Sequence, residues 1–259
     1  MKRSVSWKVC IGKNMDSWSE DESFWKAMEP ALCAPARIAL AEADVAKILS
    51  IAPVREGSTI LDLACGPGSH AVEFARRGHF VTGLDQSASL LGRARAAAEA
   101  RNLRIEWIRD DMRTFRRPSA FDLVCSLYAS LAYFDDVTNR LVLENVHASI
   151  KADGVFVLDV LGRESLARNW QERAWTEVDG TLYFQRRRVA DSWSTLVEEW
   201  SVVTNGKRNT YQTRQRLYAG TELRDLLLSV GFSRADLFGS LDGNAYDESA
   251  RRLIAVARV

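Results

Sequence analysis

Two glycines and an aspartate in the first third of the chain have the types and spacing that could do chemistry. Residues 61–71 read L-D-L-A-C-G-P-G-S-H-A, an apolar run followed by a glycine turn and the start of a helix. Gly66 and Gly68 lack a Cβ, so their backbone can approach a ligand closely. Asp85 ends the next apolar run, 19 residues after Gly66, where its carboxylate can accept both hydroxyls of a ribose. This spacing predicts an edge that binds a nucleoside.

The elements that must position this turn alternate between strands and helices. Apolar runs predict strands at 59–64, 80–85, 104–108, 121–126 and 154–160, and helical spacing predicts helices over 35–53, 88–101 and 137–150. Strands joined by helices must be parallel. We therefore expect an α/β fold with a doubly wound, mostly parallel, seven-stranded Rossmann-like sheet, which a helix at 222–230 and strands at 232–238 and 252–259 complete.

The segment 163–218 has a different pattern. Runs at 182–189, 195–204 and 209–218 alternate with a period of two, and Asn205-Gly206 is a strong signal for a hairpin turn. A small antiparallel sheet inserted into the parallel fold is predicted. We therefore divide the chain into three parts: 1–57, an N-terminal arm and helices that cap the cofactor site; 58–162 with 219–259, the cofactor-binding domain; and 163–218, an inserted lid or substrate subdomain.

Composition narrows the class of protein. The 259 residues include 35 Lys and Arg against 34 Asp and Glu, and this net charge of +1 argues against a protein that tracks a polyanion. The uncharged stretch 123–134 is too short to span a bilayer, and Lys8 and Lys13 interrupt any signal peptide. Cys10, Cys33, Cys65 and Cys125 lack metal-ligand spacing, so no metal site is expected. These features predict a cytoplasmic protein with no membrane association.

Three motifs together resemble a known family. The run D-L-A-C-G-P-G with its internal Asp62, then G-L-D-Q-S around Asp85, then R-D-D-M at 109–112, looks like the class I S-adenosylmethionine-dependent methyltransferases. The resemblance implies that Asp62 supports the methionine amino group, Asp85 the ribose, and Asp111 the adenine, with the Met112 side chain against the ring. The full set of implied cofactor residues is Asp62, Ala64, Gly66, Pro67, Gly68, Asp85, Gln86, Asp111, Met112, Ser126 and Leu127.

The charge of Asp62 agrees with this resemblance. A sulfonium cofactor has no pyrophosphate, and a carboxylate is favourable near its ammonium group. The alternative is an NAD(P)-dependent oxidoreductase on the same fold, which needs a proton donor beside the hydride. The sequence has no Tyr-x-x-x-Lys motif, and its only candidate imidazole acids are His70, His79 and His147. An RNA or protein methyltransferase is a second alternative, although no basic stripe supports it. Asp110 stands beside Asp111, and a shift in register would exchange the two.

Methyl transfer requires the acceptor to be aligned with the departing sulfur, so an elaborate catalytic triad is unnecessary. Tyr128, just after the fourth predicted strand, is the candidate catalytic residue. Other candidates for contact with the acceptor are Trp25 near the N-terminus, Arg163 after the fifth strand, and Arg216 and Tyr218 in the inserted sheet. The resemblance implies a small-molecule acceptor, with nitrogen slightly favoured over oxygen. We expect a monomer or a homodimer.

Overall fold

The computed structural model describes residues 15–259, so Cys10 and the arm 1–14 lie outside the described residues. A seven-stranded sheet forms the body of the protein, in the order β10-β11-β5-β4-β1-β2-β3. Only β11 runs antiparallel to its neighbours β5 and β10. The strands are β1 (Thr59–Leu63), β2 (Phe80–Asp85), β3 (Glu106–Arg109), β4 (Phe121–Ser126), β5 (Ile150–Val160), β10 (Arg234–Phe238) and β11 (Leu253–Arg258).

Helices cover both faces of this sheet, because successive strand residues point to opposite sides. On one face, Leu61 and Leu63 of β1 belong to a core with α5 (Asp136–Ser149) and α7 (Gly220–Ser229). On the other, Ile60 packs with α2 (Pro35–Ile51) and α3 (Ser69–Arg76). α4 (Ala88–Glu99) follows β2, and the Ser87 side chain caps it by accepting the Leu90 N–H, as expected. The doubly wound α/β fold is therefore confirmed.

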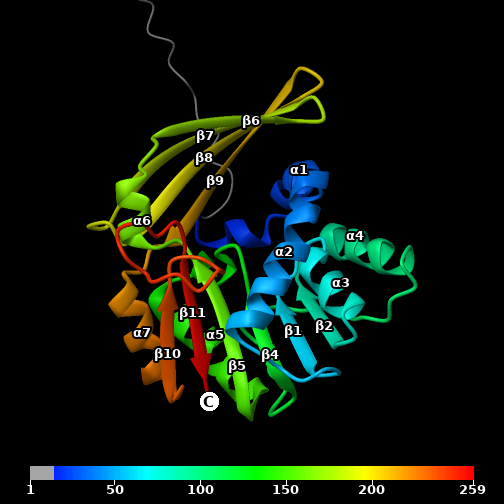
Figure 1. Ribbon diagram of the computed structural model, residues 1–259. Coiled ribbons are helices and arrows are strands. Elements are labelled where there is room, and N and C mark those ends of the chain that lie inside the picture. Colours follow the sequence, from blue (N-terminus) through cyan, green and yellow to red (C-terminus); the bar gives the residue numbers. More distant parts are fainter. Residues whose placement is uncertain (1–14) are drawn as a thin grey trace, which may run out of the picture.

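A second, four-stranded antiparallel sheet has the order β6-β7-β8-β9. Its strands are β6 (Arg173–Val178), β7 (Thr181–Ala190), β8 (Thr195–Thr204) and β9 (Lys207–Arg216), and the short helix α6 (Arg163–Arg168) leads into it. The hairpin at Asn205-Gly206 is present. Figure 1 shows this sheet beyond the carboxyl ends of the parallel strands. The inserted antiparallel sheet is thus confirmed.

The N-terminal elements η1 (Met15–Glu20) and α1 (Glu22–Leu32) lie beneath the second sheet (Figure 1). The indole of Trp18 donates to the Arg214 carbonyl at 2.8 Å, and Tyr211 and Tyr183 donate through their hydroxyls to carbonyls of α1. The Asp21 side chain caps α1 by accepting the Ser23 N–H at 2.9 Å. Residues far apart in sequence therefore form one layer over the parallel sheet.

Some boundaries differ from the sequence prediction. β3 begins at Glu106 rather than 104, and β9 ends at Arg216 rather than 218. The sequence analysis missed β6, because most residues of this edge strand are exposed and give no apolar alternation. It also missed α1 and α6. No helix within residues 15–259 has the length and apolar character needed to cross a bilayer.

Candidate active site

The turn between β1 and α3 needs its two glycines for different reasons. Gly66 has a φ of +54°, and a Cβ built on it would meet nothing within 4 Å. Gly68 has a φ of +77°, but its Cβ would lie 2.6 Å from the Trp107 ring and 2.7 Å from Ala94. Gly66 thus borders open space in a cavity, whereas Gly68 allows the turn to pack against β3 and α4.

Asp62 on β1 carries a buried carboxylate with spare hydrogen-bonding capacity. The residue is only 2% exposed, and its Oδ2 atom has no hydrogen-bond partner among the described residues. Burial raises the pKa of Asp62 to about 6, although nearby His70 and the Ala71 N–H oppose this rise. An unpaired buried carboxylate oxygen is costly. A cationic donor at the cavity would therefore be bound strongly here.

Asp85 ends β2, the strand paired with β1, and lines the same cavity. Its Oδ2 accepts the Gly66 N–H at 2.8 Å and its Oδ1 accepts the Ser87 N–H at 2.9 Å. These bonds fix the plane of the carboxylate and leave one lone pair on each oxygen. Burial raises the pKa of the Asp85 carboxyl despite these hydrogen bonds. Two hydroxyls side by side, as on a ribose, match this arrangement.

The loop after β3 supplies two carboxylates to the cavity, and both Asp110 and Asp111 line it. Asp111 pairs with Arg113, which holds the pKa of that carboxyl below its usual range in spite of burial. Arg113 also pairs with Glu20 of η1 at 2.6 Å. Asp110 accepts the Asp111 N–H at 2.7 Å. The loop therefore connects the cavity to the N-terminal elements.

Most of the predicted cofactor residues converge on one cavity. The members that line it are Asp62, Ala64, Gly66, Pro67, Asp85, Gln86, Asp111, Met112 and Leu127. Gly68 lies behind the turn, and Ser126 is fully buried with its hydroxyl unpaired among the described residues. The sequence analysis did not select further lining residues from α1, α2 and the loop after β4, which include Leu32, Arg37, Ser130 and Tyr133.

Of the predicted acceptor residues, Trp25 and Tyr128 line the cavity. Trp25 on α1 packs against Tyr133 of η2 (Ser130–Tyr133), with ring centroids 6.1 Å apart. Tyr128 has a φ of +57°, and its N–H donates to Asp159 at 2.8 Å. Its hydroxyl donates to Asp44 at 2.8 Å, and burial together with this carboxylate raises its pKa to about 12. Tyr128 is therefore held in place as a neutral phenol.

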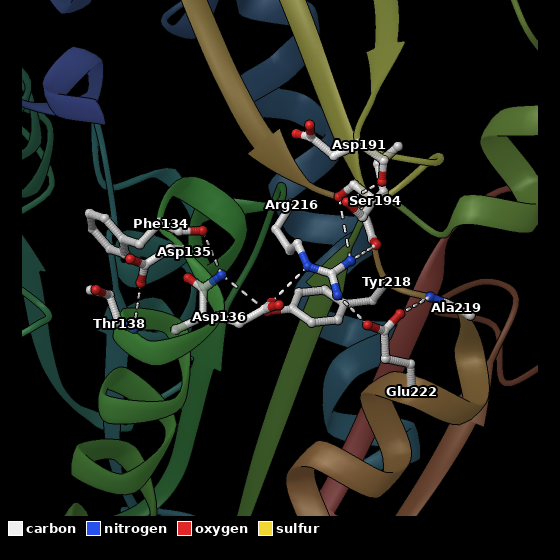
Figure 2. A network of polar contacts seen from close by, with 12 residues as sticks. Phe134, Asp135, Asp136, Thr138, Asp191, Ser194, Arg216, Tyr218, Ala219 and Glu222 are labelled. Atoms are coloured by element: carbon white, nitrogen blue, oxygen red, sulfur yellow. Dashed lines mark hydrogen bonds and ion pairs between the residues drawn. The ribbon is translucent and has the colours of Figure 1, made fainter. Parts of the chain in front are cut away.

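The other three predicted acceptor residues do not line the cavity. Figure 2 shows Arg216 between Asp136 and Glu222, with the Tyr218 ring beside it. Tyr218 is 1% exposed and accepts a hydrogen bond from Asn139 at 3.0 Å. Arg163 donates to Glu222 at 2.8 Å.

Arg163, Arg216 and Tyr218 are thus engaged by chain partners, and their contact with the acceptor stays a prediction. The acidic residues of this network are Glu222 on α7 and Asp136 on α5. Their position beside the inserted strands could not be predicted from the sequence. The network fastens the end of β9 to the body of the protein, so the three residues meet chain partners instead of the cavity.

Comparison with known proteins agrees with this geometry. Residues 60–154 match the family model described as "Methyltransferase domain". An uncharacterized methyltransferase of Synechocystis is 33% identical over 178 residues, which cover 68% of this chain and 76% of that protein. The chain belongs to the class I S-adenosylmethionine-dependent methyltransferases. S-adenosylmethionine is therefore its cofactor, and the oxidoreductase alternative is wrong.

Two further proteins extend this comparison. The crystal structure of an S-adenosylmethionine-dependent methyltransferase from Clostridium acetobutylicum has the same fold, with a TM-score of 0.70 at 17% identity over 96% of this chain and 93% of that one. A dTDP-3-amino-3,4,6-trideoxy-α-D-glucopyranose N,N-dimethyltransferase of Streptomyces venezuelae is 35% identical over 78 residues, 30% of this chain and 31% of that protein. These 78 residues are a local similarity only.

Proposed function

We propose that this methyltransferase transfers the methyl group to a small molecule, and that the acceptor atom is a nitrogen rather than an oxygen. The observation that carries the choice of atom is the local similarity to the Streptomyces N,N-dimethyltransferase, which is named for an amino-sugar substrate. A neutral amine attacks without prior loss of a proton, whereas a hydroxyl acceptor needs a base. The two phenols that line the cavity do not supply this base near neutral pH, because burial raises the pKa of both Tyr128 and Tyr133 to about 12. His70 lines the cavity as well, so the phenols alone do not decide the acceptor atom.

The cavity fits the cofactor on three points. Asp62 has an unpaired buried oxygen for an ammonium group, Gly66 leaves open space beside the backbone, and Asp85 retains two acceptor positions. S-adenosylmethionine supplies a methyl group that its positively charged sulfur already activates. On this proposal Asp62 binds the methionine amino group, Asp85 binds the ribose, and Asp110 and Asp111 lie at the adenine with Met112.

The remaining residues of the site would align the acceptor and exclude water. Trp25 and Tyr133 form an aromatic wall over the cavity, and Tyr128, fixed by Asp44 and Asp159, closes the side after β4. Aromatic faces favour the positive charge that develops on an attacking amine. We therefore propose that η1, α1 and the second sheet cover the site, with Trp25 and Tyr128 as the acceptor contacts.

Turnover with matched acceptors tests this proposal. The enzyme is incubated with S-adenosylmethionine labelled in the methyl group and with pairs of small molecules that differ only by an amine or a hydroxyl, such as a dTDP-amino sugar and its hydroxyl counterpart. We expect label in the amine product and at least a tenfold lower rate with the hydroxyl. Asp85→Ala is the negative control. Faster transfer to hydroxyls would overturn the choice of nitrogen.

A further inference from the structure

We propose that Arg37 on α2 is the anion-binding residue of the active site and takes a carboxylate or phosphate group of a bound small molecule. This inference rests on the proposed function only in placing the ligand within the same cavity. Arg37 is not among the site residues predicted from the sequence, because its segment shows only the amphipathic spacing of a helix.

The first observation is the charge of the cavity. Arg37 is the only lysine or arginine among the lining residues in the described part of the chain. The carboxylates that line the same cavity come from the sheet: Asp62 from β1, Asp85 from β2, and Asp110 and Asp111 from the loop after β3. The cavity is therefore polarised, with acids along the sheet edge and one permanent cation on α2.

The second observation is that Arg37 has no acidic partner. The other arginines beside the site are paired: Arg113 with Asp111 and Glu20, and Arg252 with Asp159. Within residues 15–259 the guanidinium of Arg37 makes no hydrogen bond or ion pair, although the residue is half-buried. Its five N–H donors are thus available to a ligand.

The third observation is that Arg37 is held in place without using these donors. Its guanidinium carbon lies 4.2 Å from the centroid of the Tyr128 ring, a cation–π contact that leaves the N–H donors unused. Tyr128 is itself fixed, because its hydroxyl donates to Asp44 and its N–H donates to Asp159. Asp44 also lies 3.4 Å from the His70 ring nitrogen Nε2.

A preorganised, unpaired guanidinium is suited to bidentate recognition of a planar carboxylate or of a phosphate. Asp44 does not neutralise it, because that carboxylate is committed to Tyr128 and His70. Two ligands can supply the anion: the methionine carboxylate of the cofactor, or an acidic group on the acceptor. Both have the same chemistry at Arg37, and binding measurements separate them.

Isothermal titration of the wild-type enzyme and Arg37→Met provides the test. The probes are S-adenosylhomocysteine, 5′-methylthioadenosine, which lacks the amino-acid portion, and dTDP added to the enzyme saturated with S-adenosylhomocysteine. If Arg37 binds the cofactor carboxylate, Arg37→Met weakens S-adenosylhomocysteine at least tenfold and changes 5′-methylthioadenosine less than twofold. If it binds an acidic acceptor, only dTDP binding is lost. Arg37→Lys should recover part of the lost affinity, because it retains the charge but not the fork.

Two controls keep the inference distinct from the proposed function and from misfolding. Arg95→Met removes an exposed arginine of α4 that does not line this cavity, and it should change none of the three affinities. Unchanged affinities for all probes in a folded Arg37→Met enzyme would overturn the inference. An equal loss of affinity for S-adenosylhomocysteine and 5′-methylthioadenosine in Arg37→Met would also overturn the inference. Failure of the wild type to bind either adenosine ligand would instead contradict the placement of the cofactor.

Discussion

The difference between the two turn glycines gives a sharp prediction. Gly66→Ala introduces a methyl group into open space, so its cost to folding is limited to the positive φ of +54°, about 1 to 2 kcal/mol. The same methyl occupies the space that the cofactor needs. We expect S-adenosylhomocysteine to bind at least about 30-fold more weakly, which corresponds to about 2 kcal/mol.

Gly68→Ala is the matched control. Its methyl would lie 2.6 Å from Trp107, so overpacking of about 1 to 3 kcal/mol adds to the cost of a φ of +77°. This variant should lose more stability in denaturant unfolding than Gly66→Ala. Affinity is measured by isothermal titration below the unfolding transition of each variant. Normal affinity in Gly66→Ala would refute the placement of the cofactor against this turn.

Three other predictions follow from single contacts. The pKa of Asp62 in the free enzyme is about 6, and an ammonium ligand favours its ionised form. The affinity for S-adenosylhomocysteine should therefore fall as pH drops from 7.5 to 5, whereas the affinity for 5′-methylthioadenosine should change less. Equal pH profiles for the two ligands would contradict the binding of the amino group by Asp62. Glu20→Gln removes the ion pair with Arg113 and should speed S-adenosylhomocysteine release two- to fivefold in stopped-flow measurements. Glu144→Gln, which changes an exposed residue of α5, should leave the release rate unchanged. Equal rates in the two variants would show that the Glu20–Arg113 pair does not hold η1 over the cavity. Arg216→Ala should lower the melting temperature by a few degrees and leave the affinity for S-adenosylhomocysteine within about threefold of the wild type. A loss of affinity without a loss of stability would instead indicate that Arg216 contributes to the cofactor site.

The pH prediction has a counterpart in stability. The folded pKa of Asp62 lies above its ordinary value of 3.8, so the folded state binds more protons between about pH 4 and 6. The contribution of Asp62 to the free energy of unfolding is therefore greatest below pH 4 and declines as pH rises through 6. Asp62→Asn should remove this component, and the bound cofactor should offset the cost of the buried charge at neutral pH.

The sequence predicted those parts of the site that are local in the chain. The glycine turn, Asp62 and Asp85 are each defined by a strand and the few residues after it, and strand alternation places them at one edge of the sheet. The Asn205-Gly206 hairpin is equally local, because the turn type depends on the two residues themselves.

The parts that could not be predicted depend on how separate elements pack. Arg37 lines the cavity because α2 packs against α3 and Tyr128, which are distant from it in the sequence. Conversely, Arg216 and Tyr218 carry side chains typical of binding sites, yet Glu222 and Asn139 from other elements engage them. Residue type and strand face suggested chemistry for Arg216 and Tyr218 but not for Arg37, and in both cases the contacts come from elements that are distant in the sequence.

The most direct test of the central claim is isothermal titration of the wild-type enzyme with S-adenosylhomocysteine and, separately, with NAD⁺, repeated with Asp85→Ala. We expect saturable binding of S-adenosylhomocysteine and no comparable binding of NAD⁺. The variant should lose about 2 to 3 kcal/mol of binding free energy, because two charge-assisted hydrogen bonds to the ribose disappear. Binding of S-adenosylhomocysteine that is unchanged in a folded Asp85→Ala enzyme would contradict the assignment of this cavity as the cofactor site.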